Sequence, residues 1–355
     1  MSQIEGASGV RDEDRFDIDA VRAWLAERGT ELGVDVEVQQ FGGGASNLTY
    51  SLRDGSHDLI LRRPPSGQKA KGAHDMGREF RIQDGLREVF PLVPEMVAFC
   101  DDESVIGSEF YVMQRVPGII PRRDFPPGVT LSEKQTRELC TNALDVLIDL
   151  HGVDVDATPL ASMNKGAGYV ARQISGWSTR FRNAHTEDIG DYEEVMAWLA
   201  EHQPDDLASC MIHNDFRFDN LVLDRDDPTR PVGVLDWEMA TVGDPLMDLG
   251  GTLAYWVQDT DDEFFRMFRR QPTNLPGMLS RPEVVDYYCE KMGYSLTPDQ
   301  WRFYEVYGLF RLGVIAQQIY YRFFHGQTTN EAYEIFGPAA NHLEQRCNQI
   351  IAAAG

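Results

Sequence analysis

Short alternating runs of apolar and polar residues mark the first third of the chain, and longer helical periods mark the rest. Five runs have the alternation of short β-strands: residues 34–41, 47–52, 58–62, 95–100 and 109–116. Residues 73–89 instead repeat apolar side chains at helical spacing. The pair Asp54-Gly55 is a strong hairpin signal between two of the runs. We therefore expect a five-stranded antiparallel sheet with one inserted helix over the first 117 residues.

Helical periods dominate the chain after this region. They fall near residues 132–150, 167–183, 191–202, 245–257, 281–292, 297–324 and 329–352. One short β region at 211–236 interrupts them. The polar, acidic residues 1–16 have no such period and predict a disordered tail. The pattern therefore predicts an α+β, bilobal fold, with a small antiparallel β lobe carrying one helix (17–117) and a larger, mostly helical lobe (118–355).

Charge and cysteine usage narrow the class of protein. The chain carries 33 basic and 57 acidic residues, a net charge of −24, which argues against a nucleic-acid partner. No apolar run has the ~18 residues that a membrane span needs, so we expect no membrane partner. The polar start lacks the apolar core of a signal peptide, and the five cysteines are scattered without a C-x-x-C pair. These features favour reduced thiols and a cytoplasmic location.

The strongest chemical signal is the run H-N-D-F-R-F-D-N at 213–220, which leads into a short apolar strand. Within it, Asp215 precedes Asn220 by five positions. Phosphoryl transfer relies on positioning and charge neutralisation rather than on covalent help from the protein. In such a loop the Asp can accept the proton of a substrate hydroxyl, and the Asn amide oxygen can bind magnesium. An isolated Asp-x4-Asn occurs by chance, so the motif needs a second element.

That second element is the run V-G-V-L-D-W-E at 232–238. Two short strands flank the turn-rich stretch 224–231. Pairing them symmetrically about Pro228 places Asn220 opposite Asp236, because each lies eight positions from Pro228. Magnesium prefers oxygen ligands grouped on one side, which leaves room for water and phosphate oxygens. The spacing therefore predicts a magnesium clamp of Asn220 and Asp236, against the alternative that both are ordinary turn residues.

The two runs, H-N-D-F-R-F-D-N-L and then V-L-D-W-E, resemble the aminoglycoside phosphotransferase family of the protein-kinase-like fold. Other parts of that pattern follow in the same order across roughly residues 35–260. The resemblance implies an O-phosphotransferase that uses ATP and Mg²⁺, with Asp215 as base and positioner and with Asn220 and Asp236 as metal ligands. More narrowly, a branch with kinase-like domains fused to acyl-CoA dehydrogenases is similar at residues 61–67, 78–80, 104–113 and 168–177.

The same resemblance implies that the small lobe binds the nucleotide. The implied nucleotide-binding residues are Gly43, Gly44, Ser46, Asn47, Arg62, Glu79, Gln114 and Val116. The first four resemble part of the family's phosphate loop, although a hairpin turn alone also explains the glycines. Arg62 stands where the family usually has a phosphate-binding Lys, with Glu79 as its implied ion-pair partner. Gln114 and Val116 belong to the implied hinge, whose backbone groups would meet adenine.

The sequence after Asp236 favours a small acceptor over a protein acceptor. Asp244-Pro245 follows after a short loop, which leaves no long activation segment. We therefore expect a small-molecule hydroxyl as the partner, either hydroxyacyl-CoA-like or aminoglycoside-like. Arg62 in place of Lys also suits a catalytically silent nucleotide-binding kinase-like protein. Metal-dependent hydrolysis would need a second His or carboxylate at ligand spacing beside His213. ATP and GTP both remain open as donors at this point.

Overall fold

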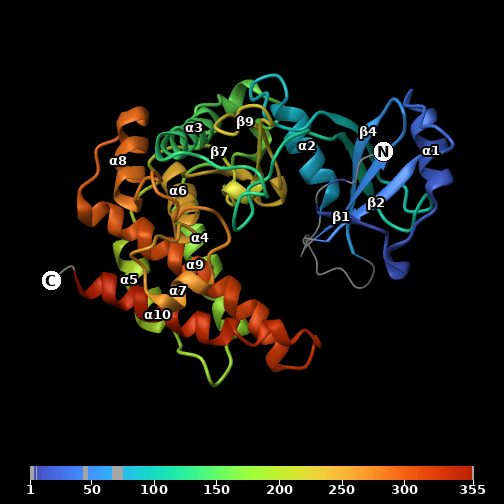
Figure 1. The fold of residues 1–355 in the computed structure, drawn as a ribbon. Coiled ribbons are helices and arrows are strands. Elements are labelled where there is room, and N and C mark those ends of the chain that lie inside the picture. Colours follow the sequence, from blue (N-terminus) through green and yellow to red (C-terminus); the bar gives the residue numbers. More distant parts are fainter. Residues whose placement is uncertain (1–3, 5, 43–46, 66–74, 354–355) are drawn as a thin grey trace. The chain divides into compact units, whose positions relative to one another are not determined.

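The computed structural model describes residue 4 and residues 6–42, 47–65 and 75–353. Helices and antiparallel strands are both present, which confirms the predicted α+β class (Figure 1). The chain forms two compact units. The smaller unit comprises the residues up to Gly118 together with Thr158–Leu160 and Val232–Ala240, and the larger comprises Ile119–Ala157, Ala161–Pro231 and Thr241–Gly355. The segment that carries Asp236 thus belongs to the smaller unit, although it lies far along the chain.

The smaller unit is built on one antiparallel sheet. Its strands are β1 (Ala7–Ser8), β2 (Glu37–Phe41), β3 (Leu48–Arg53), β4 (Asp58–Arg63), β5 (Met96–Cys100) and β6 (Phe110–Gln114). Their order is β1-β2-β3-β4-β6-β5. Five of these strands match the alternating runs of the sequence, and β1 extends the sheet at one edge. Two helices belong to the same unit, α1 (Ile18–Ala26) and α2 (Met76–Leu86).

Side chains of β4 alternate between the two faces of this sheet. Leu59 belongs to the core that contains Trp24 of α1, and Ile60 belongs to a separate core that contains Met76 of α2. Arg62 lies two residues after Ile60 and therefore faces α2. The alternation of one strand thus delivers a cation to the helix side of the sheet.

Residues 7–16 differ from the disordered tail predicted for the start of the chain. Strand β1 pairs with β2. The side chain of Asp14 is buried and accepts a hydrogen bond from Gln40 Nε2 at 2.8 Å. The backbone carbonyl of Asp14 accepts further bonds from the Tyr50 hydroxyl at 2.8 Å and from Arg63 Nη2 at 2.6 Å. These partners are distant in sequence, so no local apolar period could indicate them.

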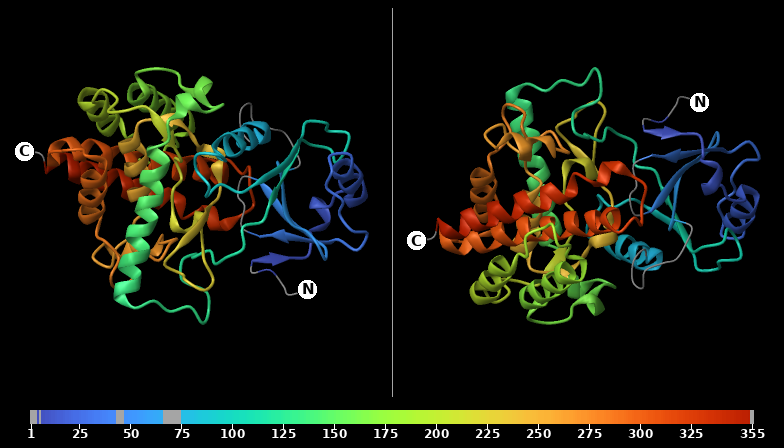
Figure 2. Two further views of the ribbon diagram at one scale, coloured as in Figure 1. Left: turned by 90° about the horizontal axis from the view of Figure 1, so that it is seen from above. Right: turned by 90° about the horizontal axis from the view of Figure 1, so that it is seen from below.

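Helices make up most of the larger unit. They are α3 (Glu133–His151), α4 (Tyr169–Ala184), α5 (Glu193–His202), α6 (Pro245–Ala254), α7 (Glu263–Met267), α8 (Arg281–Met292), α9 (Pro298–Phe324) and α10 (Phe336–Ala352). Ser132, Ser280 and Thr297 begin α3, α8 and α9, each in a reciprocal capping pair with the residue three positions later. Helices α9 and α10 lie side by side (Figures 1 and 2).

Two short strand pairs carry the segments with the chemical motifs. Strands β7 (Cys210–Ile212) and β10 (Thr241–Gly243) are antiparallel, with Ile212 opposite Thr241. Strands β8 (Leu221–Leu223) and β9 (Pro231–Val234) form a second pair, at the point where the chain passes between the units. The single-turn 3-10 helices η4 (Phe218–Asn220) and η5 (Trp237–Met239) adjoin β8 and β9 in sequence.

All five cysteines are buried and none forms a disulfide. In the part of the chain that the structure describes, no helix is both long and apolar enough to cross a membrane.

Helices α6 and α9 cross at two glycines. A methyl group on Gly308 would lie 2.1 Å from the carbonyl oxygen of Gly250. A methyl group on Gly250 would lie 2.5 Å from the carbonyl oxygen of Tyr304. The two backbones are therefore in contact, and only glycine leaves room for this approach. The crossing holds α9 against the helix that carries Asp248.

We predict that Gly308→Ala lowers the free energy of unfolding by about 1–3 kcal/mol, because the added methyl overlaps a backbone oxygen of the facing helix. Gly176→Ala in α4 is the control. Its methyl would meet the flexible end of Arg180 at 3.5 Å, and alanine is favoured over glycine in a helix by about 1 kcal/mol. Urea unfolding measures both variants, and a shift in the same direction for both would contradict the close crossing.

Candidate active site

One buried carboxylate holds the first residues of the loop at 213–220. Asp248 lies in the first turn of α6 and its side chain is 1% exposed. Its two oxygens accept hydrogen bonds from the backbone N–H groups of His213 and Asn214, each at 2.8 Å. His151 of α3 makes a third contact, with Nε2 3.1 Å from Oδ2 of Asp248. Two successive peptide groups of the loop are therefore fixed to a single helix.

The charge of Asp248 is stabilised by these contacts. Burial acts to raise the pKa of Asp248, but the hydrogen bond and charge of His151, together with His213, lower the pKa below its ordinary value. The other ring nitrogen of His151 lies 2.6 Å from the hydroxyl of Tyr288. The ring of His151 therefore contacts the carboxylate through Nε2 and the hydroxyl through Nδ1. The anchor is thus an ionised carboxylate inside a complete hydrogen-bond chain.

The loop turns sharply at Asn214, whose φ is 64°. A left-handed conformation is uncommon for a residue other than glycine, although asparagine tolerates it better than most. Arg311 of α9 donates from Nη2 to the carbonyl oxygen of Asn214 at 2.7 Å. The N–H of Asp215 donates to Nδ1 of His213 at 3.2 Å. Contacts before and after the turn thus hold the backbone in the conformation that presents Asp215.

The structure brings Asp215 and Asn220 together. Nδ2 of Asn220 donates to the backbone oxygen of Asp215 at 2.9 Å and to its Oδ2 at 3.0 Å. Nη1 of Arg217 lies 3.3 Å from the other carboxylate oxygen, and the Asp215 side chain is 19% exposed. Because Nδ2 is used twice by Asp215, Oδ1 of Asn220 is left without a hydrogen-bond partner among the residues that the structure describes. The amide is therefore oriented with its oxygen available to a ligand.

Sequence reasoning missed the role of Arg217 inside the motif itself. Its guanidinium also contacts Asp219 at 2.9 Å and lies over the ring of Tyr255, 4.8 Å from the centroid. Burial acts to lower the pKa of Arg217, but Asp215 and Asp219 raise it above its ordinary value. An Arg two positions after the proposed base, with an Asp two positions further, is a spacing that could have indicated this ion pair.

Arg62 is the centre of the corresponding group in the smaller unit. Its Nη1 lies 2.5 Å from Oε1 of Glu79 on α2, and its Nη2 lies 3.1 Å from Oδ1 of Asp236. Glu79 is 1% exposed and Asp236 is 34% exposed. Burial acts to lower the pKa of Arg62, but the surrounding negative charges, that of Glu79 foremost, raise it well above its ordinary value. The residue is therefore a permanent cation between two carboxylates.

Asp236 is held in place by its neighbours in the chain. It has a φ of 67°, in the left-handed region. Beyond it, Arg78 of α2 donates to the carbonyl oxygen of Glu238 at 2.8 Å and also to that of Ala240. The side chain of Asn47 donates to Oε2 of Glu238 at 3.1 Å. These contacts attach the segment after Asp236 to α2 and to the end of the phosphate loop predicted from sequence.

Of the remaining residues predicted to bind the nucleotide, only some lie in the described part of the chain. Gly43, Gly44 and Ser46 lie outside the described residues. Gln114 ends β6, and its N–H donates to the carbonyl oxygen of Glu95 at 2.8 Å. Val116 packs on Gly233, where a methyl group would lie 2.9 Å from its Cγ1.

The predicted clamp of Asn220 and Asp236 stays a prediction, because its two members belong to different units. Each residue nevertheless keeps one oxygen for a ligand. Oδ2 of Asp236, like Oδ1 of Asn220, has no hydrogen-bond partner in the described ranges. Those ranges also contain no group of three or more His, Cys, Asp or Glu side chains that could hold a metal ion.

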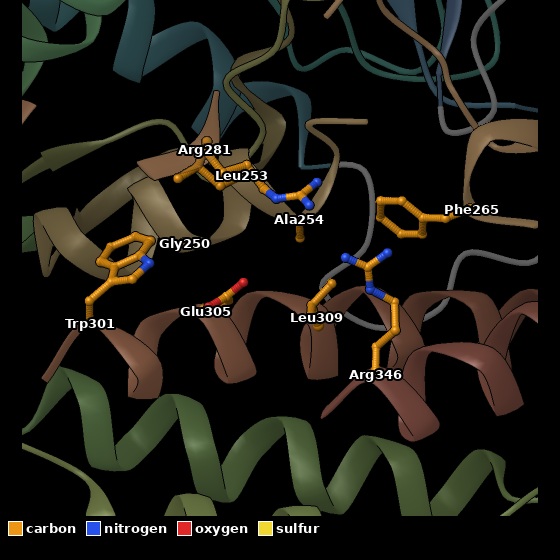
Figure 3. A pocket seen from close by; sticks show the side chains of 9 residues that line it. All are labelled: Gly250, Leu253, Ala254, Phe265, Arg281, Trp301, Glu305, Leu309 and Arg346. Carbon is orange, nitrogen blue, oxygen red and sulfur yellow. The ribbon is translucent and has the colours of Figure 1, made fainter. Parts of the chain in front are cut away.

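One enclosed pocket of the larger unit is too small for a substrate. It has a volume of about 20 Å³, which is room for about one water molecule. Figure 3 shows the carboxyl of Glu305 and the guanidiniums of Arg281 and Arg346 around it. Both arginines contact Asp261, at 2.7 Å and 3.3 Å. This cluster joins α8, α9 and α10 and is structural.

Comparisons with known proteins agree on one family. Residues 37–282 match the model of the phosphotransferase enzyme family. Mouse acyl-CoA dehydrogenase family member 10 is 36% identical over 320 residues, which cover 89% of this chain and 29% of that protein. Human acyl-CoA dehydrogenase family member 11 is 32% identical over 357 residues, which cover 97% of this chain and 45% of that protein. The chain thus spans less than half the length of these relatives.

A solved structure supports the same assignment. A Ralstonia eutropha protein, provisionally named an aminoglycoside phosphotransferase, has a TM-score of 0.77 and 28% sequence identity. The similarity covers 94% of this chain and 99% of that one. The resemblance stated from the sequence motifs is therefore confirmed, as is the protein-kinase-like fold.

We predict that Asp248→Asn lowers the free energy of unfolding by about 3 kcal/mol at pH 7, because an amide N–H₂ replaces an oxygen that accepts backbone N–H donors. The pKa of Asp248 is depressed in the fold, so its contribution is present above the ordinary value of 3.8 and is lost as the pH falls through the folded value. The difference from the native protein should hold from about pH 7 to pH 5 and shrink only below about pH 4.

Urea unfolding at each pH measures this difference. Asp205→Asn, at an exposed position of the same unit, is the control and should change little. A difference that shrinks already between pH 7 and pH 5 would contradict a depressed pKa of Asp248.

Proposed function

Because this chain belongs to the phosphotransferase enzyme family, we propose that it is a small-molecule kinase that transfers the γ-phosphate of ATP to a hydroxyl. The observation that supports this most directly is the pairing of Asp215 with Asn220. One side-chain amide donates to both the backbone and the carboxylate of the proposed base, and its own oxygen is turned away. A positioned carboxylate beside an available amide oxygen suits phosphoryl transfer.

In the proposed reaction Asp215 accepts the proton of the acceptor hydroxyl. The hydroxyl oxygen forms its bond to the γ-phosphorus as the bond to the bridging oxygen of ADP breaks, and ADP leaves with that electron pair. Arg217 and Asn220 hold the two carboxylate oxygens, so the proton acceptor has little freedom to rotate. Asp248 and Arg311 contribute indirectly, because they fix the peptide groups on either side of Asn214.

The residues present fit magnesium in chemistry. Asn220 and Asp236 each keep one oxygen available, and Mg²⁺ prefers amide and carboxylate oxygens together with phosphate oxygens and water. When bound, the ion neutralises phosphate charge as it develops during transfer. We propose these two residues as the ligands.

On the nucleotide side we propose Arg62 as the phosphate-binding cation. Glu79 fixes its position, as a buried carboxylate 2.5 Å from Nη1. An arginine can bind phosphate oxygens with two donors in one plane, which a lysine cannot. The other proposed contacts are those of the implied phosphate loop and hinge: Gly43, Gly44, Ser46, Asn47, Gln114 and Val116.

We propose a hydroxyacyl-CoA-like acceptor ahead of an aminoglycoside-like one, and a cytoplasmic location. Both relatives described above are named for acyl-CoA dehydrogenase families, and this chain matches only part of each. A net charge of −24 would itself suit a cationic acceptor. The acceptor is therefore best settled by testing both classes in parallel.

One observation favours a second candidate, a catalytically silent nucleotide-binding protein. Arg62 contacts the proposed metal ligand Asp236 at 3.1 Å, and a guanidinium in that place could substitute for the ion. This candidate predicts binding of ATP without turnover of any acceptor.

We predict that Asp215→Asn lowers kcat by about 10²–10⁴-fold, because the amide cannot take the proton of the acceptor. The measurement is ATP-dependent phosphorylation of a panel of hydroxyacyl-CoA thioesters and aminoglycosides, with and without Mg²⁺. Asp226→Asn, at an exposed site in the turn after β8, is the control and should retain activity. Turnover that persists in Asp215→Asn, or that does not need Mg²⁺, would rule out the proposed roles.

We predict that Arg62→Met raises the KM for ATP about tenfold or more and leaves Glu79 as an unpaired buried carboxylate, whereas Arg62→Lys keeps the charge and loses less. Steady-state kinetics over a range of ATP concentrations separates the two variants. Thermal unfolding checks that each is folded. An unchanged KM in Arg62→Met would remove Arg62 from the nucleotide site.

A further inference from the structure

Two arginines of the larger unit, Arg311 and Arg180, have no carboxylate partner among the residues that the structure describes. Arg311 of α9 is 5% exposed. Its Nη2 donates to the carbonyl oxygen of Asn214, one residue before Asp215. Its Nε and Nη1 have no hydrogen-bond partner among the described residues, and no described carboxylate pairs with it. Two of the three guanidinium nitrogens therefore have no hydrogen-bond acceptor in the described part of the chain.

Arg180 of α4 is exposed and lies over the same aromatic ring as Arg311. The guanidinium carbon of Arg180 is 4.6 Å from the ring centroid of Trp177, and that of Arg311 is 5.3 Å from the same ring. Burial raises the pKa of Tyr307 to about 12, while Arg311 and Arg180 both act to lower it. Both cations therefore lie near the same tryptophan and the same tyrosine. We call these four side chains the α4–α9 cluster.

Other arginines near the cluster are already engaged. Arg182, two residues after Arg180, binds both oxygens of Glu193 at 2.7 and 2.6 Å. Arg172, earlier in the same helix, donates to the carbonyl oxygens of Ala167 and Gly166 at 2.6 and 3.0 Å. Arg180 has neither a carboxylate nor a carbonyl partner in the ranges that the structure covers.

A buried guanidinium without a carboxylate is unfavourable unless something else compensates its charge. Around Arg311 the compensation is partial: one carbonyl oxygen, the face of Trp177, and the more distant charge of Asp215. In a chain with 57 acidic residues, a nearby Asp or Glu would be an easy alternative. Arg180 is exposed, but the absence of a carboxylate in the described contacts of the buried Arg311 points to a negative charge that arrives with a ligand.

We propose that Arg180 and Arg311 form an anion-binding subsite for the acceptor. The subsite takes a carboxylate or phosphate group of the molecule whose hydroxyl is phosphorylated, and Trp177 packs against its apolar part. This rests on the proposed function and names the substrate class: an anionic hydroxy compound rather than a polycationic sugar. Since Arg311 contacts the residue before Asp215, the anionic group binds close to the reacting hydroxyl.

The test compares Arg180→Ala with Arg182→Ala, which removes an equally exposed arginine of the same helix that is already paired. Each is assayed with three acceptors: a hydroxy acid, its neutral methyl ester, and a phosphorylated hydroxy compound. Arg180→Ala should raise the KM about tenfold or more for the anionic acceptor that the subsite takes, with the KM for the ester unchanged. Comparing the hydroxy acid with the phosphorylated compound identifies which anion binds. Equal losses for ester and acid, or no loss, would overturn the proposal.

Arg311→Lys is the second variant, because it keeps a positive charge in the buried position. It should also discriminate less between acid and ester, with circular dichroism confirming that it is folded. If the native protein phosphorylates only neutral or cationic acceptors, the proposed function stands and the subsite is wrong.

If the native protein phosphorylates nothing, the proposed function fails and the subsite is tested by binding alone. Calorimetric titration with inorganic pyrophosphate should then show about tenfold weaker binding to Arg180→Ala than to Arg182→Ala. Equal affinity for the two variants, or no binding to the native protein, would overturn the subsite.

Discussion

The buried carboxylate of Asp248 is the constraint on which the rest of the loop at 213–220 depends. A left-handed residue at Asn214 is strained, and it persists because contacts on both sides leave the backbone no alternative. Asp248 accepts hydrogen bonds from the N–H groups of His213 and Asn214, and Arg311 donates one to the carbonyl oxygen of Asn214. Both anchors lie on helices whose backbones touch at Gly250 and Gly308. The position of Asp215 therefore depends on a helix crossing, which tolerates no added volume, as well as on contacts within the loop.

The groups assigned to the phosphoryl transfer are divided between the two units. Asp215 and Asn220 belong to the larger unit, whereas Arg62 and Asp236 belong to the smaller one. The chain achieves this division by returning to the smaller unit after β8, where contacts from α2 hold the segment. Each half is internally supported: the base by an amide and a guanidinium, the cation by a buried carboxylate. Either half can therefore keep its local geometry without the other.

Local features were predictable from the sequence, and distant ones were not. Strand alternation indicated the sheet and favoured Arg62 over Arg63 as the phosphate-binding residue, because a period of two depends only on neighbouring residues. The spacing of Asp215 and Asn220 lies within one loop, so their contact follows from a short stretch of chain. Asp248, His151 and Arg311 act on that loop across much longer separations, with no periodicity to reveal them. The order of residues 7–16 was missed for the same reason, since the partners of Asp14 lie on the sheet.

The charges around the catalytic loop give a further reason to expect a divalent cation. Asp215 and Asp219 are two carboxylates that share one guanidinium, that of Arg217. This balance leaves no excess positive charge for a triphosphate, and the chain as a whole has a net charge of −24. Bringing a polyanion to such a loop without further cations would be opposed by Coulomb repulsion that a low local dielectric strengthens. Arg62 supplies one positive charge but already faces two carboxylates. For the proposed ATP donor, the remaining compensation would arrive with the nucleotide, and this is the role proposed for magnesium.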